Sequence, residues 1–212
     1  MPSLRAPLTL ILLLAGALPG TCAAAEAPPA PVLATPVEGT LPNGLRYFIL
    51  PLVTEPGRVS LRLLVRAGSL DEREDELGYA HFVEHMAYNG TRHYPPGQLV
   101  RFFQKTGLVW GADANADTSF TFTNYKLDLP AGHATHLPEA LQILRDFADG
   151  IEFAAGEVRR ERGVVLSELR ERSTNSKQTD RQIVAALYRG TALPARLPMG
   201  DAGQIERATA TT

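Results

Sequence analysis

The chain has 212 residues, a formal net charge of −2 at neutral pH and a single cysteine, Cys22. This length is enough for one domain with a hydrophobic core, and the slightly acidic charge argues against a nucleic-acid partner. Beyond residue 25 the absence of cysteine excludes disulfides, a thiolate nucleophile and a Cys-rich metal cluster.

Residues 1–25 have the pattern of a secretory signal peptide. Arg5 precedes an apolar stretch at 8–18, and the small residues up to Ala25 provide an Ala-x-Ala cleavage site. The stretch is too short to span a membrane. We therefore expect cleavage near Ala25, export, most simply to the periplasm, and no transmembrane span. A lipid anchor on Cys22 is the alternative, but the preceding Leu-Pro-Gly-Thr is a poor lipidation box.

The first elements after this leader are predicted strands. Residues 26–36, rich in Pro and Ala, predict an extended lead-in, and residues 37–212 predict one domain. Asn43-Gly44 between two β-rich runs indicates a hairpin, and a third run alternates apolar with other residues. The three predicted strands are 37–41, 45–50 and 58–67.

A helix is predicted next, from about residue 76 to just before Asn89, and it contains His81-Phe-Val-Glu84-His85. Positions i and i+4 share a helix face, so His81 and His85 can bind one metal ion, and Glu84 is placed to accept a proton from a metal-bound water. This H-x-x-E-H order is the inverzincin signature of zinc peptidases. A chance match is the alternative, and a third ligand is required. The acidic run 71–76 before the helix is predicted to be solvated and to have no catalytic role.

The remaining elements are mostly helical. Helix 97–105 is predicted to end at Gly107 and to turn Leu99, Val100, Phe102 and Phe103 inward. One strand is predicted at 118–129, followed by helices at 138–150, 154–172 and 179–189. Strands followed by helices predict an α+β domain, with a mostly antiparallel sheet and helices packed on one face.

The helix at 154–172 offers a candidate for the third ligand. Glu161, Val164, Val165 and Glu168 share one face, so two carboxylates fall on the stripe expected to face the core. A zinc ion held by two histidines would supply the positive charge that buried carboxylates need. Glu168 is then the candidate ligand and Glu161 a supporting group, while two surface glutamates are the alternative. The other histidines, His93, His133 and His136, are expected to be exposed.

These motifs together resemble the N-terminal domain of the pitrilysin/insulysin family of zinc peptidases (M16), most closely its exported bacterial PqqL-like branch. The matching stretches span most of residues 37–212 in the family's order. They are 41–45 (Leu-Pro-Asn-Gly-Leu), 68–70 (Gly-Ser-Leu), 81–91 (the H-x-x-E-H motif and its continuation), 111–115 (Gly-Ala-Asp-Ala-Asn) and 161–168 (Glu-Arg-Gly-Val-Val-Leu-Ser-Glu).

The resemblance implies that His81, His85 and Glu168 bind Zn²⁺, that Glu84 is the general base of an endopeptidase, and that Glu161 supports the site. It also implies that residues 111–119 pair with an extended substrate, a peptide or an unfolded protein segment, and that Asn115 belongs to that substrate-binding wall.

Family members close a C-terminal half or a partner subunit over this domain, so the resemblance implies such a partner here, and we expect the domain to be incomplete at its C-terminal end. The sequence leaves two alternatives to an active peptidase open. One is a non-catalytic peptide-binding or scaffold subunit, and the other is an inactive truncated fragment.

Overall fold

The structure is a computed structural model that describes residues 34–52, 55–171 and 175–212. The signal peptide predicted at 1–25 and most of the lead-in at 26–36 lie outside these residues. The chain divides into two compact units, Met1–Pro51 and Leu52–Thr212. No helix in the described residues is long and apolar enough to cross a membrane.

The first unit contains the predicted hairpin. Strands β1 (Val37–Thr40) and β2 (Arg46–Ile49) pair antiparallel, with Val37 opposite Ile49. The turn uses Gly44 at a φ of 87°, a left-handed conformation that glycine adopts without strain. The Asn43 side chain accepts a hydrogen bond from the Leu45 N–H at 3.1 Å. The Asn-Gly signal therefore predicted this element correctly.

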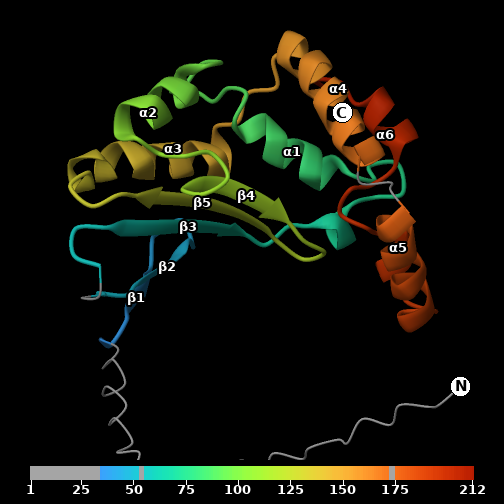
Figure 1. The fold of residues 1–212 in the computed structure, drawn as a ribbon, viewed down its shortest axis with the longest axis horizontal. Helices are drawn as coiled ribbons and strands as arrows, with labels where there is room; N and C mark the ends of the chain where they lie inside the picture. Colours follow the sequence, from blue (N-terminus) through green and yellow to red (C-terminus); the bar gives the residue numbers. More distant parts are fainter. Residues whose placement is uncertain (1–33, 53–54, 172–174) are drawn as a thin grey trace, which may run out of the picture. The chain divides into compact units, whose positions relative to one another are not determined.

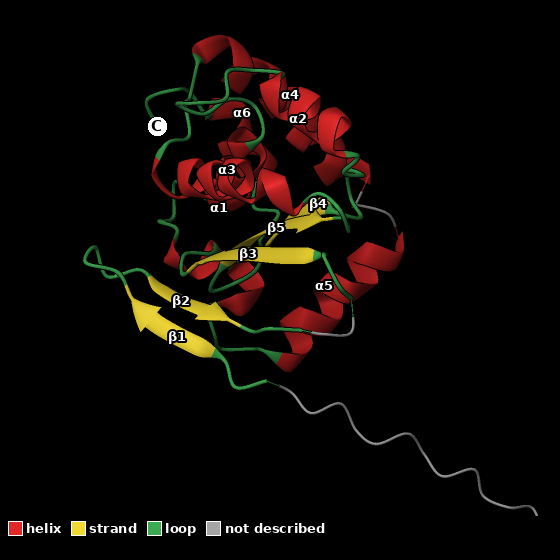
Figure 2. Cartoon of the chain, turned by 90° about the vertical axis from the view of Figure 1, so that its left-hand side faces the viewer, coloured by secondary structure: helices red, strands yellow, loops and turns green. Residues whose placement is uncertain are grey.

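The second unit contains a three-stranded antiparallel sheet in the order β3-β5-β4 (Figure 2). Its strands are β3 (Val59–Val65), β4 (Ala114–Thr118) and β5 (Thr123–Leu129). The single strand predicted at 118–129 is wrong, because the chain reverses where the Ser119 N–H bonds the Phe122 carbonyl at 2.8 Å. Phe120 and Phe122 continue the apolar alternation through this turn, and no Gly or Pro marks it.

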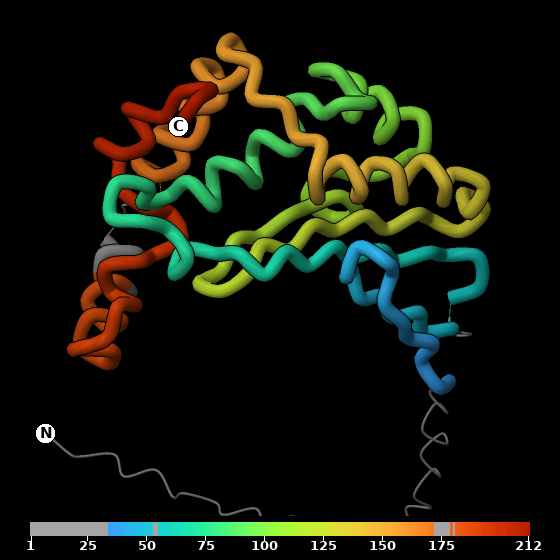
Figure 3. The backbone as a smooth tube through the Cα atoms, turned by 180° about the vertical axis from the view of Figure 1, so that it is seen from behind, coloured from blue at the N-terminus to red at the C-terminus, as the bar shows by residue number. Residues whose placement is uncertain are grey.

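The helices confirm the predicted mixture of helix and antiparallel sheet. Figures 1 and 3 show α1 to α4 on the same side of the sheet, while α5 packs beside the short 3₁₀ turn Leu193–Ala195. A short sixth helix near the C-terminus was not predicted. The helices are α1 (Tyr79–Ala87), α2 (Gln98–Thr106), α3 (Leu137–Asp149), α4 (Ala155–Glu171), α5 (Asn175–Leu187) and α6 (Ala202–Arg207).

Two apolar clusters hold these layers together. The larger joins the inner face of β5 to α2 and α3, and the smaller joins α1, α4 and α6 through Phe82, Met86, Val158, Val165 and Ile205. Burial of this apolar surface is the main favourable term for the packing.

Two of the side chains expected to point inward do not. Val100 is 54% exposed and Val164 is 47% exposed. Each lies one position away from its helix's buried stripe, which in α2 is Leu99, Phe102, Phe103 and Thr106 and in α4 includes Val158, Glu161 and Val165. A valine next to a buried position looks apolar in the sequence but projects about 100° away from it.

The acidic run before α1 has a structural role that the sequence did not reveal. α1 begins at Tyr79, later than predicted, and the Glu72 carboxylate accepts hydrogen bonds from the N–H groups of Gly78 (3.0 Å) and Ala80 (2.8 Å). These amides at the start of a helix otherwise lack partners. Glu72 therefore anchors the start of the helix that carries the H-x-x-E-H motif.

A fully buried carboxylate anchors the loop after α1. Asp146 of α3 accepts hydrogen bonds from the Thr91 hydroxyl (2.8 Å), the His93 backbone (2.9 Å) and ring (2.8 Å), and the Gln142 amide (3.0 Å). Arg145 adds a guanidinium nitrogen 3.7 Å from the carboxylate. Burial raises the pKa of Asp146, but the hydrogen bonds outweigh it and the pKa is lowered. The charged form is therefore favoured in the folded chain.

We expect Asp146→Asn to lower the free energy of unfolding at pH 7 by about 1.5–3 kcal/mol, the usual range for hydrogen bonds to a charged group. Because the folded-state pKa lies below the unfolded value, this stabilisation is complete above the unfolded pKa and is lost as pH falls through the folded one. The difference between the two proteins should therefore shrink below about pH 4. Chemical denaturation at pH 7 and pH 3.5 measures it.

Asp149→Asn is the matched control, since its carboxylate lies on the same helix but is 57% exposed. Its effect should stay within about 0.5 kcal/mol. An equal loss of stability in both variants, or a difference for Asp146→Asn that is independent of pH, would contradict the role given to Asp146.

Candidate metal centre

The two histidines of the H-x-x-E-H motif project from one face of α1. Their ring centroids are 4.6 Å apart and the ring planes meet at 78°. His81 is buried, and His85 is partly exposed at the same site. Phe82 and Met86, on the neighbouring face, pack against Val158 and Val165 of α4. The apolar contact therefore places α4 next to the two imidazoles.

Glu168 reaches the histidines from α4. Its Oε2 atom lies 3.2 Å from His85 Nε2 and 3.8 Å from His81 Nε2. Ligand atoms of the three residues lie within 4.8 Å of one another. A zinc ion with bonds of about 2.0–2.2 Å needs its ligand atoms roughly 3–3.5 Å apart, and two imidazoles with one carboxylate are a donor set of catalytic zinc sites. The three residues fit a zinc ion after small side-chain adjustments.

Glu161 lies two turns before Glu168 and contacts the other side of the His85 ring. Its Oε1 atom is 2.8 Å from His85 Nδ1, and only 8% of the residue is exposed. Burial lowers the pKa of His85, but the carboxylates of Glu161, Glu84 and Glu168 outweigh it, so the pKa is raised. In the neutral ring that binds a metal, a proton held on Nδ1 by Glu161 leaves the Nε2 lone pair directed at the site.

Glu84 lies beside the three metal-binding candidates and is 8% exposed. Burial raises the pKa of its carboxyl, although a hydrogen bond from the Thr118 hydroxyl to Oε2, at 2.6 Å, opposes this. A raised pKa suits a carboxylate that must accept and return a proton near neutral pH. Burial and the Glu84 charge also raise the pKa of Tyr88 and Tyr125, so both phenols remain protonated.

Thr118 is a site residue that no sequence pattern indicated. It ends β4, and its contact with Glu84 joins residues 34 positions apart. No spacing rule relates a residue of a strand to a residue of an earlier helix, so the sequence contains no local signal for this hydrogen bond.

The other candidates are not part of this cluster. Asn115 lies on β4, is exposed, and pairs in register with Lys126. Because side chains alternate along a strand, its side chain is on the opposite face from that of Thr118. His93 is exposed as expected and binds Asp146, whereas His133 and His136 are partly buried and stack on each other, which corrects the expectation of exposure for these two.

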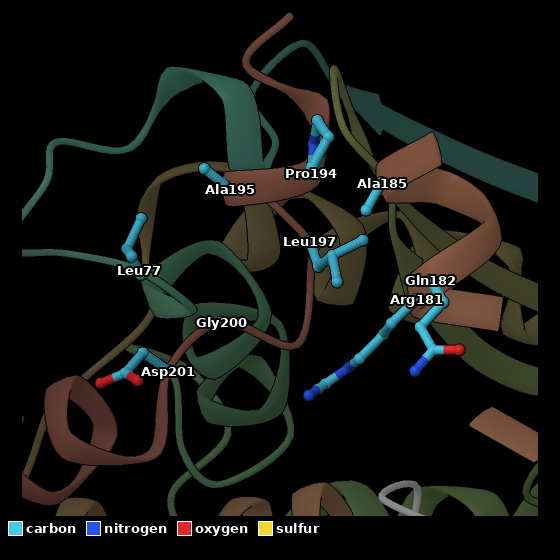
Figure 4. Close-up of a pocket in the computed structure, with 9 residues that line it drawn as sticks. All are labelled: Leu77, Arg181, Gln182, Ala185, Pro194, Ala195, Leu197, Gly200 and Asp201. Atoms are coloured by element: carbon cyan, nitrogen blue, oxygen red, sulfur yellow. The ribbon is translucent and has the colours of Figure 1, made fainter. Parts of the chain in front are cut away.

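A separate pocket lies between α5 and the segment leading into α6 (Figure 4). Arg181 and Gln182 reach it from α5, and Asp201 from the start of α6. Its lining residues are Leu77, Arg181, Gln182, Ala185, Pro194, Ala195, Leu197, Gly200 and Asp201. None of them belongs to the metal-binding cluster, so the pocket is not the place of the predicted chemistry.

Comparison with known proteins links this chain to one family. A model of the insulinase family (peptidase family M16) matches residues 53–200. The probable zinc protease PqqL of Haemophilus influenzae is 36% identical over 172 residues, which are 81% of this chain and 19% of the relative. The probable zinc protease PqqL of Escherichia coli is 40% identical over 153 residues, which are 72% and 16% of the two chains. This chain thus spans less than a fifth of these relatives' length.

Two solved structures of named proteases are similar to this chain. The first half of the periplasmic protease PqqL from Escherichia coli superposes with a TM-score of 0.79 at 35% identity, covering 83% of this chain and 38% of that one. Pitrilysin superposes with a TM-score of 0.65 at 25% identity, covering 81% and 18%.

Proposed function

The chain belongs to the insulinase family of peptidases, peptidase family M16, and we propose that it carries the zinc-binding and catalytic residues of an exported endopeptidase. Its substrates would be peptides or unfolded protein segments. The observation that carries the proposal is the convergence of His81, His85 and Glu168 beside the buried carboxylate of Glu84.

His81, His85 and Glu168 would hold the zinc ion, and Glu161 would fix the ring orientation of His85 through the 2.8 Å contact to Nδ1. Zinc bound there supplies a Lewis acid for peptide hydrolysis. Glu84 accepts a proton from the attacking water and returns it to the leaving amine. The hydrogen bond from Thr118 holds the Glu84 carboxylate in position between these two transfers.

The substrate would bind as an added strand. β4 is an edge strand of its sheet, and its last residue contacts Glu84, so an extended peptide paired with β4 passes the site where hydrolysis occurs. Asn115, on the same strand, would form part of this wall. Substrate groups further along would be held by a C-terminal half or a partner subunit, as the name of the related first half from Escherichia coli suggests.

Residues 1–25 would direct export to the periplasm as a signal peptide and would be removed near Ala25. The related protease from Escherichia coli is named as periplasmic, and the sequence pattern of residues 8–25 is independent of that name.

The proposal is tested by metal removal. The chain without residues 1–25 should bind about one zinc ion, and an unstructured fluorogenic peptide should be cleaved by it. A chelator should stop cleavage, and stoichiometric zinc should restore it, because hydrolysis at this site requires the Lewis acid that zinc supplies. Elemental analysis and the cleavage rate are measured on the same samples.

Absence of zinc from the purified chain, even after incubation with the ion, would refute the proposal. Zinc binding with no cleavage would support the peptide-binding or incomplete-enzyme alternatives over an independently active peptidase. Adding the C-terminal half of a related protease would separate these two, since only an incomplete enzyme should then gain activity.

A further inference from the structure

The open edge of β4 is short. In a strand, the N–H and C=O of alternate residues point to the same side, so Ala114, Ala116 and Thr118 direct these groups away from β5. At Ala114 both are already bonded within the chain: its N–H donates to the Val109 carbonyl (3.3 Å), and its carbonyl accepts from the Gly111 N–H (2.8 Å). A left-handed φ of 83° at Gly111 lets this loop fold back on the strand.

Ala116 and Thr118 are therefore the residues of β4 that can pair with another strand. Among the described residues, no backbone hydrogen bond engages their outward N–H and C=O groups. A peptide paired with them runs from Glu84, which contacts Thr118, toward the loop that covers Ala114. The loop ends the pairing there.

The loop presents apolar side chains at this point. Trp110 bridges to Ala114 and is 57% exposed, and Val109 is 59% exposed. The indole packs edge-on against Tyr88, with ring centroids 4.5 Å apart. At about 3.4 Å per strand residue, Trp110 lies about 7 Å from Ala116 and about 14 Å from Thr118 along the edge.

We propose that Trp110 and Val109 form a specificity subsite for an aliphatic or aromatic side chain of the substrate, three or four residues from the bond that is cleaved. The same loop restricts strand pairing to the positions opposite Ala116 and Thr118. An apolar side chain placed there covers exposed indole surface, which favours binding. The inference deepens the proposed function, because it rests on a peptide added to β4.

Trp110 is the only tryptophan of the chain, so its fluorescence reports on the subsite directly. The zinc-loaded Glu84→Gln protein would be titrated with twelve-residue Ser/Gly/Ala peptides, each carrying one Phe at a different position. One position should bind about tenfold more tightly than the Phe-free peptide and shift the emission to shorter wavelength. Backbone N-methylation should weaken binding at two positions, the donors to the Ala116 and Thr118 carbonyls.

In the same background, Trp110→Ala should remove the preference for Phe, and Trp110→Phe should keep most of it, as followed by anisotropy of labelled peptides. Leu64→Ala is the matched control, since Leu64 is 58% exposed on the outward face of β3, and it should keep the full preference. Thermal unfolding and zinc content exclude loss of fold.

Equal preference for Phe in the Trp110→Ala protein, or binding and emission that do not depend on the position of Phe, would overturn the subsite. Either result would leave the proposed function standing if the protein with Glu84 intact binds zinc and cleaves peptides. Absence of both properties from that protein would instead refute the proposed function, since neither of them requires Trp110.

Discussion

Replacing Glu84 with glutamine should lower kcat for peptide cleavage by about 10²–10⁴-fold, the usual contribution of a general base, with zinc still bound. The amide cannot take the proton of the attacking water. It keeps the size of the side chain and an oxygen that can accept the hydrogen bond from Thr118. His81, His85 and Glu168 are unchanged, so metal content should remain about one ion per chain. Steady-state kinetics and elemental analysis measure both quantities.

A stability measurement shows whether the Glu84→Gln protein loses activity because it lacks the base or because it unfolds. Burial of Glu84 disfavours its charged form and raises its pKa, so a neutral isostere should leave the melting temperature unchanged or slightly higher. Glu74→Gln is the matched control, because the Glu74 side chain is 87% exposed and lies outside the site, and it should leave kcat unchanged. A Glu84→Gln protein with full activity would exclude Glu84 as the base.

Replacing Glu168 with glutamine should weaken zinc binding by more than 100-fold. The carboxylate is the one anionic group among the three proposed ligands, and its Oε2 lies 3.2 Å from His85 Nε2. A neutral amide in its place leaves two imidazoles and a weak donor, which is insufficient for a three-ligand catalytic site. Competition with a chromophoric chelator measures the affinity.

Glu161→Gln is the comparison that tests this assignment. Glu161 lies on the same helix, one heptad earlier, and contacts His85 Nδ1 and not the metal-facing Nε2. Loss of such an orienting partner typically weakens metal binding by about 10–100-fold. A larger loss for Glu161→Gln than for Glu168→Gln would reverse the roles of the two glutamates.

The elements with local signals were predicted well. The Asn43-Gly44 turn and the glycine that ends α2 depend on residues close together in sequence, where backbone preferences operate. The prediction of a single strand at 118–129 was wrong because the turn that divides it has no such local signal. The turn at 119–122 contains no Gly, Pro, Asn or Asp, and tertiary packing decides it.

Contacts between distant segments could not be predicted from the sequence. The hydrogen bonds of Asp146 to Thr91 and His93 join polar groups whose pairing depends on how α3 packs against the loop after α1. Each polar group has many possible partners in an unfolded chain, and only packing selects one. The stripe on α4 predicted two buried carboxylates: Glu161 is buried, the Glu168 side chain is 25% exposed, and Val164 on the same stripe is exposed.

The set of chemical groups at the site follows from the amino-acid sequence alone. His81, Glu84 and His85 share one helix, and Glu161 and Glu168 share another, because the helical repeat of 3.6 residues converts their spacing into a common face. Tertiary structure decided that these two faces meet, that Thr118 bonds Glu84, and that the β4 edge remains open at Ala116 and Thr118 but is covered at Ala114. The Thr118–Glu84 contact joins residues 34 positions apart, and the Glu161–His85 contact joins residues 76 positions apart. Both form only when the apolar clusters bring the helices and the sheet together.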